Sequence, residues 1–310
     1  MKVLISGGTG FLGQSFTRLL SKQGYTLKIL SRTPEKVGIL FQKLSIETVE
    51  GDIRNPATLV HALEGVDVVI QCAQFPGHPI ENKKRGHTYW EVDALGTENL
   101  VKAATQAQVK HFIYISGAGT KETAKEPWFK AKWYAEQAVR GSGLVYTILR
   151  PSWIYGPGDK SLNQIIQMAR RLPFLPMIGL GKNRVQPLHI DDIAEIVALS
   201  VNYKGSDNRI LEVGGPEEMT MKEMMKRALR IAGLKKMIFP IPKVLAKLGA
   251  WPLQFLPNPP MTPKAIDFIT MDVSIDIKPM LKMHPSIHLK TLEESLKTYF
   301  FHNGHSTAPD

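Results

Sequence analysis

The chain has one cysteine, Cys72, among its 310 residues. A single cysteine excludes an internal disulfide and a metal site built from cysteines, and we expect a small buried side chain at this position. No apolar run approaches the ~18 residues that a membrane-spanning helix needs. The N-terminus passes directly from a charged residue into an apolar run, unlike a signal peptide. These absences predict a cytoplasmic protein without a bound metal.

Acidic residues are outnumbered, with 28 Asp and Glu against 39 Lys and Arg, giving a net charge of +11. Such an excess suits an anionic ligand such as a phosphorylated dinucleotide, but equally an anionic membrane or nucleic acid. The cations are scattered, and their clusters, such as those at 83–85 and 235–236, are short. No zinc finger, helix-turn-helix or RNA-binding signature is present. We therefore expect a solvated basic surface and no nucleic-acid partner, while a peripheral membrane or protein partner stays open, as does the oligomeric state.

What the sequence does contain is a glycine-rich stretch close to its start. Residues 3–5 form an apolar run typical of a strand buried on both faces. Apolar residues recur with helical period from 11 to 20. Between them stand Gly7, Gly10 and Gly13. Glycines at a strand-to-helix junction let the backbone approach a pyrophosphate at the positive end of the helix. A tight turn would need similar glycines, but the context favours a dinucleotide-binding loop that includes Thr9, Phe11 and Leu12.

Strand and helix patterns alternate through the first half of the chain. The predicted strands cover residues 26–30, 46–50, 67–71, 109–116 and 144–149. This alternation predicts an α/β Rossmann fold with a doubly wound parallel sheet. We expect a dinucleotide-binding domain at 1–155, its sheet completed by a segment near 183–213. A smaller C-terminal α/β lobe for substrate or partner would occupy 156–303, followed by a frayed tail at 304–310.

The end of the second predicted strand indicates the cofactor type. An acidic residue at this position usually binds the ribose 2′-hydroxyl of NAD, whereas a 2′-phosphate requires a cation. Here the strand ends in Ser31 and Arg32, with Lys36 nearby. This pair favours NADP(H) over NAD(H), although an exposed loop arginine is the alternative.

Two further strand ends are candidates for cofactor contact. Asp52 and Ile53 follow the third strand, where the carboxylate could meet the adenine amino group. The fourth strand leads into Cys72, Ala73 and Gln74, and this exit, which begins with two small side chains, would pass beneath the cofactor ribose.

Several motifs together resemble the extended and atypical short-chain dehydrogenase/reductase (SDR) superfamily, which includes the NAD-dependent epimerase/dehydratase-like proteins. The motifs lie at 7–13, 51–56, 92–100, 109–116, 150–159 and 189–194. Within the superfamily the chain is most similar to bacterial relatives of the dehydrogenase-like accessory subunit of respiratory complex I, on residues 186–192 and 212–216 and the basic, proline-rich C-terminal lobe. The resemblance implies that Pro151 and Ile154 border the nicotinamide.

The resemblance also implies a proton relay, in which a tyrosine and a lysine four residues later act as hydride moves to or from nicotinamide. Aligning Ala135-Glu136 with the family pattern places Lys132 at the lysine position and Trp128 at the tyrosine position. Indole does not titrate usefully, so Trp128 cannot supply the proton. Ser116 matches a family serine, and Lys132 would bind the nicotinamide ribose unless it is simply an exposed helix lysine. Cofactor binding is thus predicted more firmly than catalysis.

Two functions follow as hypotheses. The first is an NADP(H)-binding atypical SDR that reduces an apolar carbonyl, quinone-like or lipidic substrate without the usual tyrosine, using Ser116, water or the substrate as proton donor. The second is a non-catalytic NADP(H)-binding structural or redox-sensing protein with a protein or membrane-associated partner, as the complex I resemblance implies.

The second half of the chain gives fewer signals. We predict a helix at 162–171, and a second one capped by Thr220 whose methionines pack in the core. His189 is expected to be a packed strand-end residue and Asp191 a helix cap. Residues 238–257 carry apolar side chains at helical spacing beside Lys243 and Lys247. This segment could cover a pocket, pack in the core or lie in a membrane interface, and packing or covering is favoured.

Overall fold

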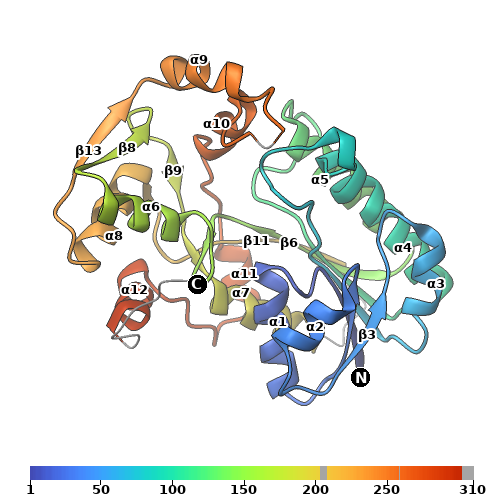
Figure 1. The fold of residues 1–310 in the computed structure, drawn as a ribbon. Coiled ribbons are helices and arrows are strands. Elements are labelled where there is room, and N and C mark those ends of the chain that lie inside the picture. Colours follow the sequence, from blue (N-terminus) through green and yellow to red (C-terminus); the bar gives the residue numbers. More distant parts are fainter. Residues whose placement is uncertain (203–207, 258, 302–310) are drawn as a thin grey trace. The chain divides into compact units, whose positions relative to one another are not determined.

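The computed structural model describes residues 1–202, 208–257 and 259–301 (Figure 1). The predicted tail at 304–310 lies outside these ranges. Contacts divide the chain into two compact units. The first comprises Met1–Pro151, Ile193–Val213 and Ile277–Met283. The second comprises Ser152–Asp192, Gly214–Asp276 and His284–Asp310.

The first unit contains a seven-stranded sheet in the order β11-β6-β5-β4-β1-β2-β3, with every pair of neighbours parallel. Its strands are β1 Lys2–Ser6, β2 Thr26–Ser31, β3 Ile46–Glu50, β4 Val68–Gln71, β5 His111–Ile115, β6 Val145–Pro151 and β11 Arg209–Val213. In β1, Val3, Leu4 and Ile5 are fully buried because strands flank it on both sides and helices cover parallel sheets. The predicted Rossmann fold is confirmed, and the seventh strand comes from 209–213.

Helices connect these strands. They are α1 Phe11–Lys22, α2 Pro34–Leu40, α3 Leu59–Ala62, α4 Gly96–Gln106 and α5 Pro127–Arg140, with α7 Ile190–Val201 beginning at the boundary between the units. Helix α11, Lys278–Met283, follows the last strand of the sheet in sequence and contacts β11. Short helical turns are η1 Pro56–Thr58, η2 Lys83–Arg85 and η3 Tyr89–Leu95. The π-helix η3 runs directly into α4 and packs against α5, which brings two motifs that are distant in sequence into contact.

The second unit is built from short strand pairs and helices. Its strands are β7 Ile154–Tyr155, β8 Phe174–Ile178, β9 Arg184–Val185, β10 Leu188–His189, β12 Met219–Thr220 and β13 Met237–Ile241, paired as β7 with β10, β9 with β12 and β8 with β13. Its helices are α6 Leu162–Arg171, α8 Met221–Ile231, α9 Lys243–Leu253, α10 Pro263–Ile269 and α12 Leu292–Phe301. The core of this unit lies between α6, α8 and α12.

Several local predictions for this unit are confirmed. Helix α6 has the predicted bounds, and the Thr220 side chain caps α8 by accepting from the Glu223 amide at 3.2 Å. Met224 and Met225 are buried in the core. The prediction that Asp191 is the cap of α7 is wrong, because the helix begins at Ile190. The Asp191 carboxylate instead pairs with Lys290 Nζ at 2.8 Å.

The segment 238–257, for which packing or covering a pocket was favoured, exposes most of its large apolar side chains. Within α9 only Ala250 is buried, and the large apolar side chains point into solvent. Figure 1 shows α9 beside α10, which it contacts. Across the described ranges no helix is long and apolar enough to cross a membrane.

Candidate functional site

The glycine loop between β1 and α1 uses its three glycines for different reasons. Gly7 has a φ of 82°, and a Cβ there would lie 2.6 Å from the Ala73 amide nitrogen. A Cβ on Gly13 would lie 2.2 Å from the Gly7 carbonyl oxygen. Both positions therefore require glycine to close the loop against its surroundings. At Gly10 such a Cβ would lie 3.1 Å from the Gly7 carbonyl oxygen, a tight contact that a small shift of the loop could relieve.

Gly10 also begins α1, and the start of this helix is suited to an anion. No side chain caps it, and no acidic residue lies in its first turn. The first N–H groups of a helix have no intrahelical acceptor and lie at its positive end. Thr9, Phe11 and Leu12 are only partly buried here, as a ligand-contacting loop requires. The loop thus fits a pyrophosphate bound through backbone amides.

Ser31 and Arg32, at the end of β2, lie in different environments. The Ser31 hydroxyl is buried and bonds with the backbone of Thr33, donating to its oxygen at 3.0 Å and accepting from its nitrogen at 3.1 Å. Arg32 is exposed. Burial lowers the pKa of His87, and the positive charges of Arg32, Arg54 and Arg85 lower it further. The charges of Arg32, Arg54 and Arg85 therefore all act on His87, and of these three only Arg32 was predicted to bind the cofactor.

Asp52 is held by Arg54 in a bidentate ion pair. Arg54 Nη2 lies 2.6 Å from Oδ2, and Nε donates to Oδ1 at 3.1 Å. Burial alone would raise the pKa of Asp52, but the hydrogen bonds from Arg54 outweigh it and hold the pKa below its ordinary value. The carboxylate is thus ionised and its direction is fixed. Next to it, the Ile53 carbonyl accepts from Asn99 Nδ2 at 3.0 Å, and its side chain is buried against Gly96.

The exit of β4 lies directly against the glycine loop. Ala73 contributes the backbone that faces Gly7. The Cys72 thiol donates to the Ser6 carbonyl at 3.1 Å, and burial raises its pKa to about 12, so it stays neutral and unreactive. Gln74 is exposed, with its amide 3.2 Å from His78 Nδ1. The structure brings Gly7 and Ala73 together as the predicted site requires.

Ser116 belongs to a buried polar network after β5. Its hydroxyl donates to Glu136 Oε1 at 2.5 Å. Glu136 is fully buried, and both of its oxygens accept from Arg150, at 2.9 and 2.6 Å. The Ser116 hydroxyl therefore already donates its hydrogen bond to a carboxylate, which argues against Ser116 as the proton donor in catalysis.

Lys132 lies on α5 and reaches the end of β5. Its Nζ is 3.2 Å from a carboxylate oxygen of Asp93 and donates to the Ile115 carbonyl at 3.3 Å. It also lies 5.4 Å from the centre of the Tyr114 ring. Burial raises the pKa of Asp93, although the Lys132 charge opposes this. Lys132 is thus a positioned, largely buried cation and not the exposed helix lysine of the alternative interpretation.

Trp128, one helical turn before Lys132, is buried in an aromatic cluster. Its ring centroid lies 6.1 Å from that of Tyr89 and 5.8 Å from that of Phe129, and Tyr89 also packs on Phe75 at 4.7 Å. The indole is thus packed among aromatic rings, at the position where the family resemblance predicts a tyrosine. Of the two residues predicted at the nicotinamide, Pro151 ends β6 in the first unit and Ile154 starts β7 in the second.

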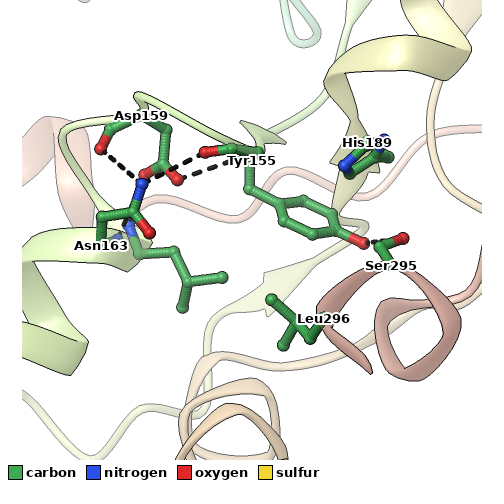
Figure 2. A pocket seen from close by; sticks show the side chains of 8 residues that line it. Tyr155, Asp159, Asn163, His189, Ser295 and Leu296 are labelled. Atoms are coloured by element: carbon green, nitrogen blue, oxygen red, sulfur yellow. Dashed lines mark hydrogen bonds between the residues drawn. The ribbon is translucent and has the colours of Figure 1, made fainter. Parts of the chain in front are cut away.

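The second unit contains a pocket of its own, shown in Figure 2. It has essentially no room for even a water-sized sphere, whereas ordinary ligand sites enclose roughly 300–1,000 Å³. Within it Tyr155 donates to Ser295 Oγ at 2.9 Å, and Asp159 accepts from the first amides of α6 (Figure 2). Burial lowers the pKa of His189 to about 4, so its ring is neutral, as expected for a packed strand end. This pocket is part of the internal packing.

The parallel sheet, the glycine loop and the uncapped start of α1 define a dinucleotide-binding protein with a Rossmann fold. The model of a family described as NAD(P)H-binding matches residues 7–172. The chain belongs to this NAD(P)H-binding family, and the resemblance to the extended and atypical SDR superfamily is confirmed. Binding of a nicotinamide dinucleotide is therefore supported.

Relatives include reductases and subunits of larger assemblies. The 2-alkyl-3-oxoalkanoate reductase of Stenotrophomonas maltophilia is 27% identical over 84% of this chain and 87% of its own length. The ceramide reductase of Caulobacter vibrioides is 29% identical over 92% of this chain and 89% of its own length. The mitochondrial NADH dehydrogenase [ubiquinone] 1 alpha subcomplex subunit 9 of Arabidopsis thaliana is 25% identical over 82% and 63%. The UDP-glucose 4-epimerase of Thermus thermophilus in complex with NAD has the same fold, with a TM-score of 0.74. It is 20% identical, and the match covers 97% of this chain and 98% of the epimerase chain.

Proposed function

We propose that the protein is an NADP(H)-dependent reductase of an apolar carbonyl compound that works without the tyrosine of the SDR relay. The observation that carries this proposal is Lys132, which Asp93 and the Ile115 carbonyl hold at the carboxyl end of β5. Ligands of doubly wound sheets bind at this edge. Two relatives whose names describe reduction of lipid-like compounds add support.

The chemistry assigns distinct tasks to the residues present. NADPH, when bound, supplies the hydride that reduces the carbonyl carbon. The loop from Gly7 to Gly13 holds the pyrophosphate, and Lys132 holds the nicotinamide ribose through an N–H not used by Asp93. The carbonyl oxygen takes its proton from water, since Trp128 does not titrate and Ser116 donates to Glu136.

The direct test is NADPH consumption by the purified protein with a panel of apolar ketones, 3-oxoacyl compounds and quinones. We expect substrate-dependent loss of NADPH absorbance above the rate without protein, together with formation of the alcohol or quinol. A Lys132→Met variant, which keeps the stem but not the charge, is expected to lose most of this rate. Tight NADPH binding without turnover across the panel would contradict the proposal.

The same result would favour a second function, a non-catalytic NADP(H)-binding protein with a structural or redox-sensing role. The specific observation behind it is that Trp128 is buried in an apolar ring cluster while the Ser116 proton is held by Glu136. In that case the second unit would bind a protein or membrane-associated partner, in line with the complex I relative.

The preference for NADP(H) is tested at Arg32. Loss of a charge-assisted contact with the 2′-phosphate typically costs about 1.5–3 kcal/mol, so Arg32→Ala is expected to weaken NADPH binding at least tenfold. NADH lacks this phosphate, and its affinity should change less than twofold. Arg140→Ala, at the exposed end of α5, is the matched control. Equal losses for both cofactors, measured by titration calorimetry, would contradict the assignment.

A further inference from the structure

An ordinary surface helix turns its apolar side chains toward the core and its charged side chains toward solvent. Helix α9 of the second unit does the opposite. Its two lysines, Lys243 and Lys247, point to α10, where both bind Asp267 at 2.9 and 2.7 Å. Ala250, one turn further on the same side, is the buried residue of the helix. The contacts of α9 with its own unit are thus made by charged and small side chains.

The large apolar side chains of α9 lie on a different side of the helix and are exposed. Val244, Leu248 and Trp251 follow one another at intervals of four and three residues, which places them in one stripe. Phe255 lies two residues beyond the end of the helix, and its ring centroid is 5.6 Å from that of Trp251. The exposed fractions of these four side chains, in sequence order, are 69%, 64%, 61% and 73%. Leu245 borders the stripe and is 59% exposed. We call these five residues the apolar face of α9. Contiguous exposed apolar patches on soluble proteins mark interaction sites.

The charge of the surrounding sequence indicates what this face meets. From residue 224 to residue 266 the chain has eight Lys and Arg and no Asp or Glu. Lys235 and Lys264 are exposed on either side of α9 in sequence. Basic residues flanking an apolar helix face, with a tryptophan in that face, are the features of helices that lie in the interface of anionic membranes. Two of the lysines are partly neutralised by Asp267, and no acidic residue on the segment itself would repel such a surface.

We propose that the apolar face of α9 docks the protein onto the surface of an anionic phospholipid bilayer. The helix lies parallel to the bilayer plane, with Trp251 and Phe255 among the acyl-chain ends and the flanking lysines at the headgroups. Eleven residues span only about 16 Å as a helix, so α9 rests on the membrane and does not cross it. The proposal does not depend on the reductase activity.

The test is flotation of the full-length protein with vesicles of phosphatidylcholine alone or mixed with phosphatidylserine. We expect binding to the mixed vesicles, weakened by salt, and little binding to phosphatidylcholine. Leu248→Glu and Trp251→Glu should each lower the apparent partition coefficient roughly tenfold, since a charged residue opposes insertion of the face. Ile39→Glu in α2, where the isoleucine is also 69% exposed, is the matched control and should bind as wild type.

Three outcomes would overturn the proposal, provided that thermal unfolding shows the variants to be folded. The first is absence of binding to the mixed vesicles at low salt. The second is equal loss for Ile39→Glu and the α9 variants. The third is that the α9 variants bind vesicles normally but dissociate a self-associated form in size-exclusion chromatography, or change NADPH affinity, which would assign the face to a second copy or to the ligand site.

Discussion

Replacing Trp128 by tyrosine is expected to raise the rate of NADPH-dependent carbonyl reduction roughly a hundredfold, the lower end of what a positioned general acid contributes. Trp128 and Lys132 are four residues apart on α5, so a phenol at 128 would share a helix face with the lysine. The charge of Lys132 would lower the pKa of this phenol and let it donate a proton to the carbonyl oxygen. The measurement is kcat with the best ketone of the panel.

Trp133→Tyr is the matched control, because it makes the same chemical change one turn further along α5 on another side. It should leave the rate unchanged. Combining Trp128→Tyr with Lys132→Met should remove the gain. If the tyrosine variant folds and binds NADPH but gains no activity, the alignment of α5 with the family relay is wrong.

The second large effect is on stability and concerns Arg150. Changing it to methionine keeps an unbranched apolar stem but leaves the fully buried Glu136 carboxylate without its cation. Removing one partner of a buried ion pair costs roughly 3–5 kcal/mol. We therefore expect Arg150→Met to lower the free energy of unfolding by about this amount, measured by urea denaturation followed by fluorescence.

Arg140→Met, at the exposed end of the same helix as Glu136, should change the free energy of unfolding by less than about 0.5 kcal/mol. The double variant Arg150→Met with Glu136→Gln should recover part of the loss, because no uncompensated charge is then buried. A loss at Arg150 as small as that at Arg140 would mean that Glu136 takes up a proton or reaches water.

The sequence predicted those parts of the fold and the site that depend on short patterns of neighbouring residues. The wholly apolar run at residues 3–5 indicates a central strand because both of its faces must be covered. The three glycines reveal the loop because no other residue fits a φ of 82° or a Cβ 2.2 Å from a carbonyl oxygen. Trp128 stood out because a helix fixes the spacing to Lys132.

The polar partners of the site could not be predicted in this way. Asp93 is 39 positions from Lys132, and they meet only because η3 packs against α5. Ser116, Glu136 and Arg150 converge from a strand end, a helix and another strand. Arg54 lies only two residues from Asp52, but its side chain is long and flexible. The sequence therefore does not reveal the direction in which it points.

What covers the apolar side of α9 could not be predicted for a different reason. Helical spacing shows that apolar residues share a side, but not what covers that side. The lysine pairs with Asp267 determine which side of α9 meets α10, and they depend on a residue 20 positions beyond Lys247.

A ribosome making this chain releases β6 well before β11, its partner at the edge of the sheet. Until residue 213 has left the exit tunnel, the outer edge of β6 has no strand to pair with, and unpaired edges promote aggregation. The family-model match ends at residue 172. A gene fragment cut at that point would keep the whole glycine loop but would encode an unfinished sheet. We expect such a fragment to be insoluble, whereas adding the segment that carries β11 should restore soluble expression.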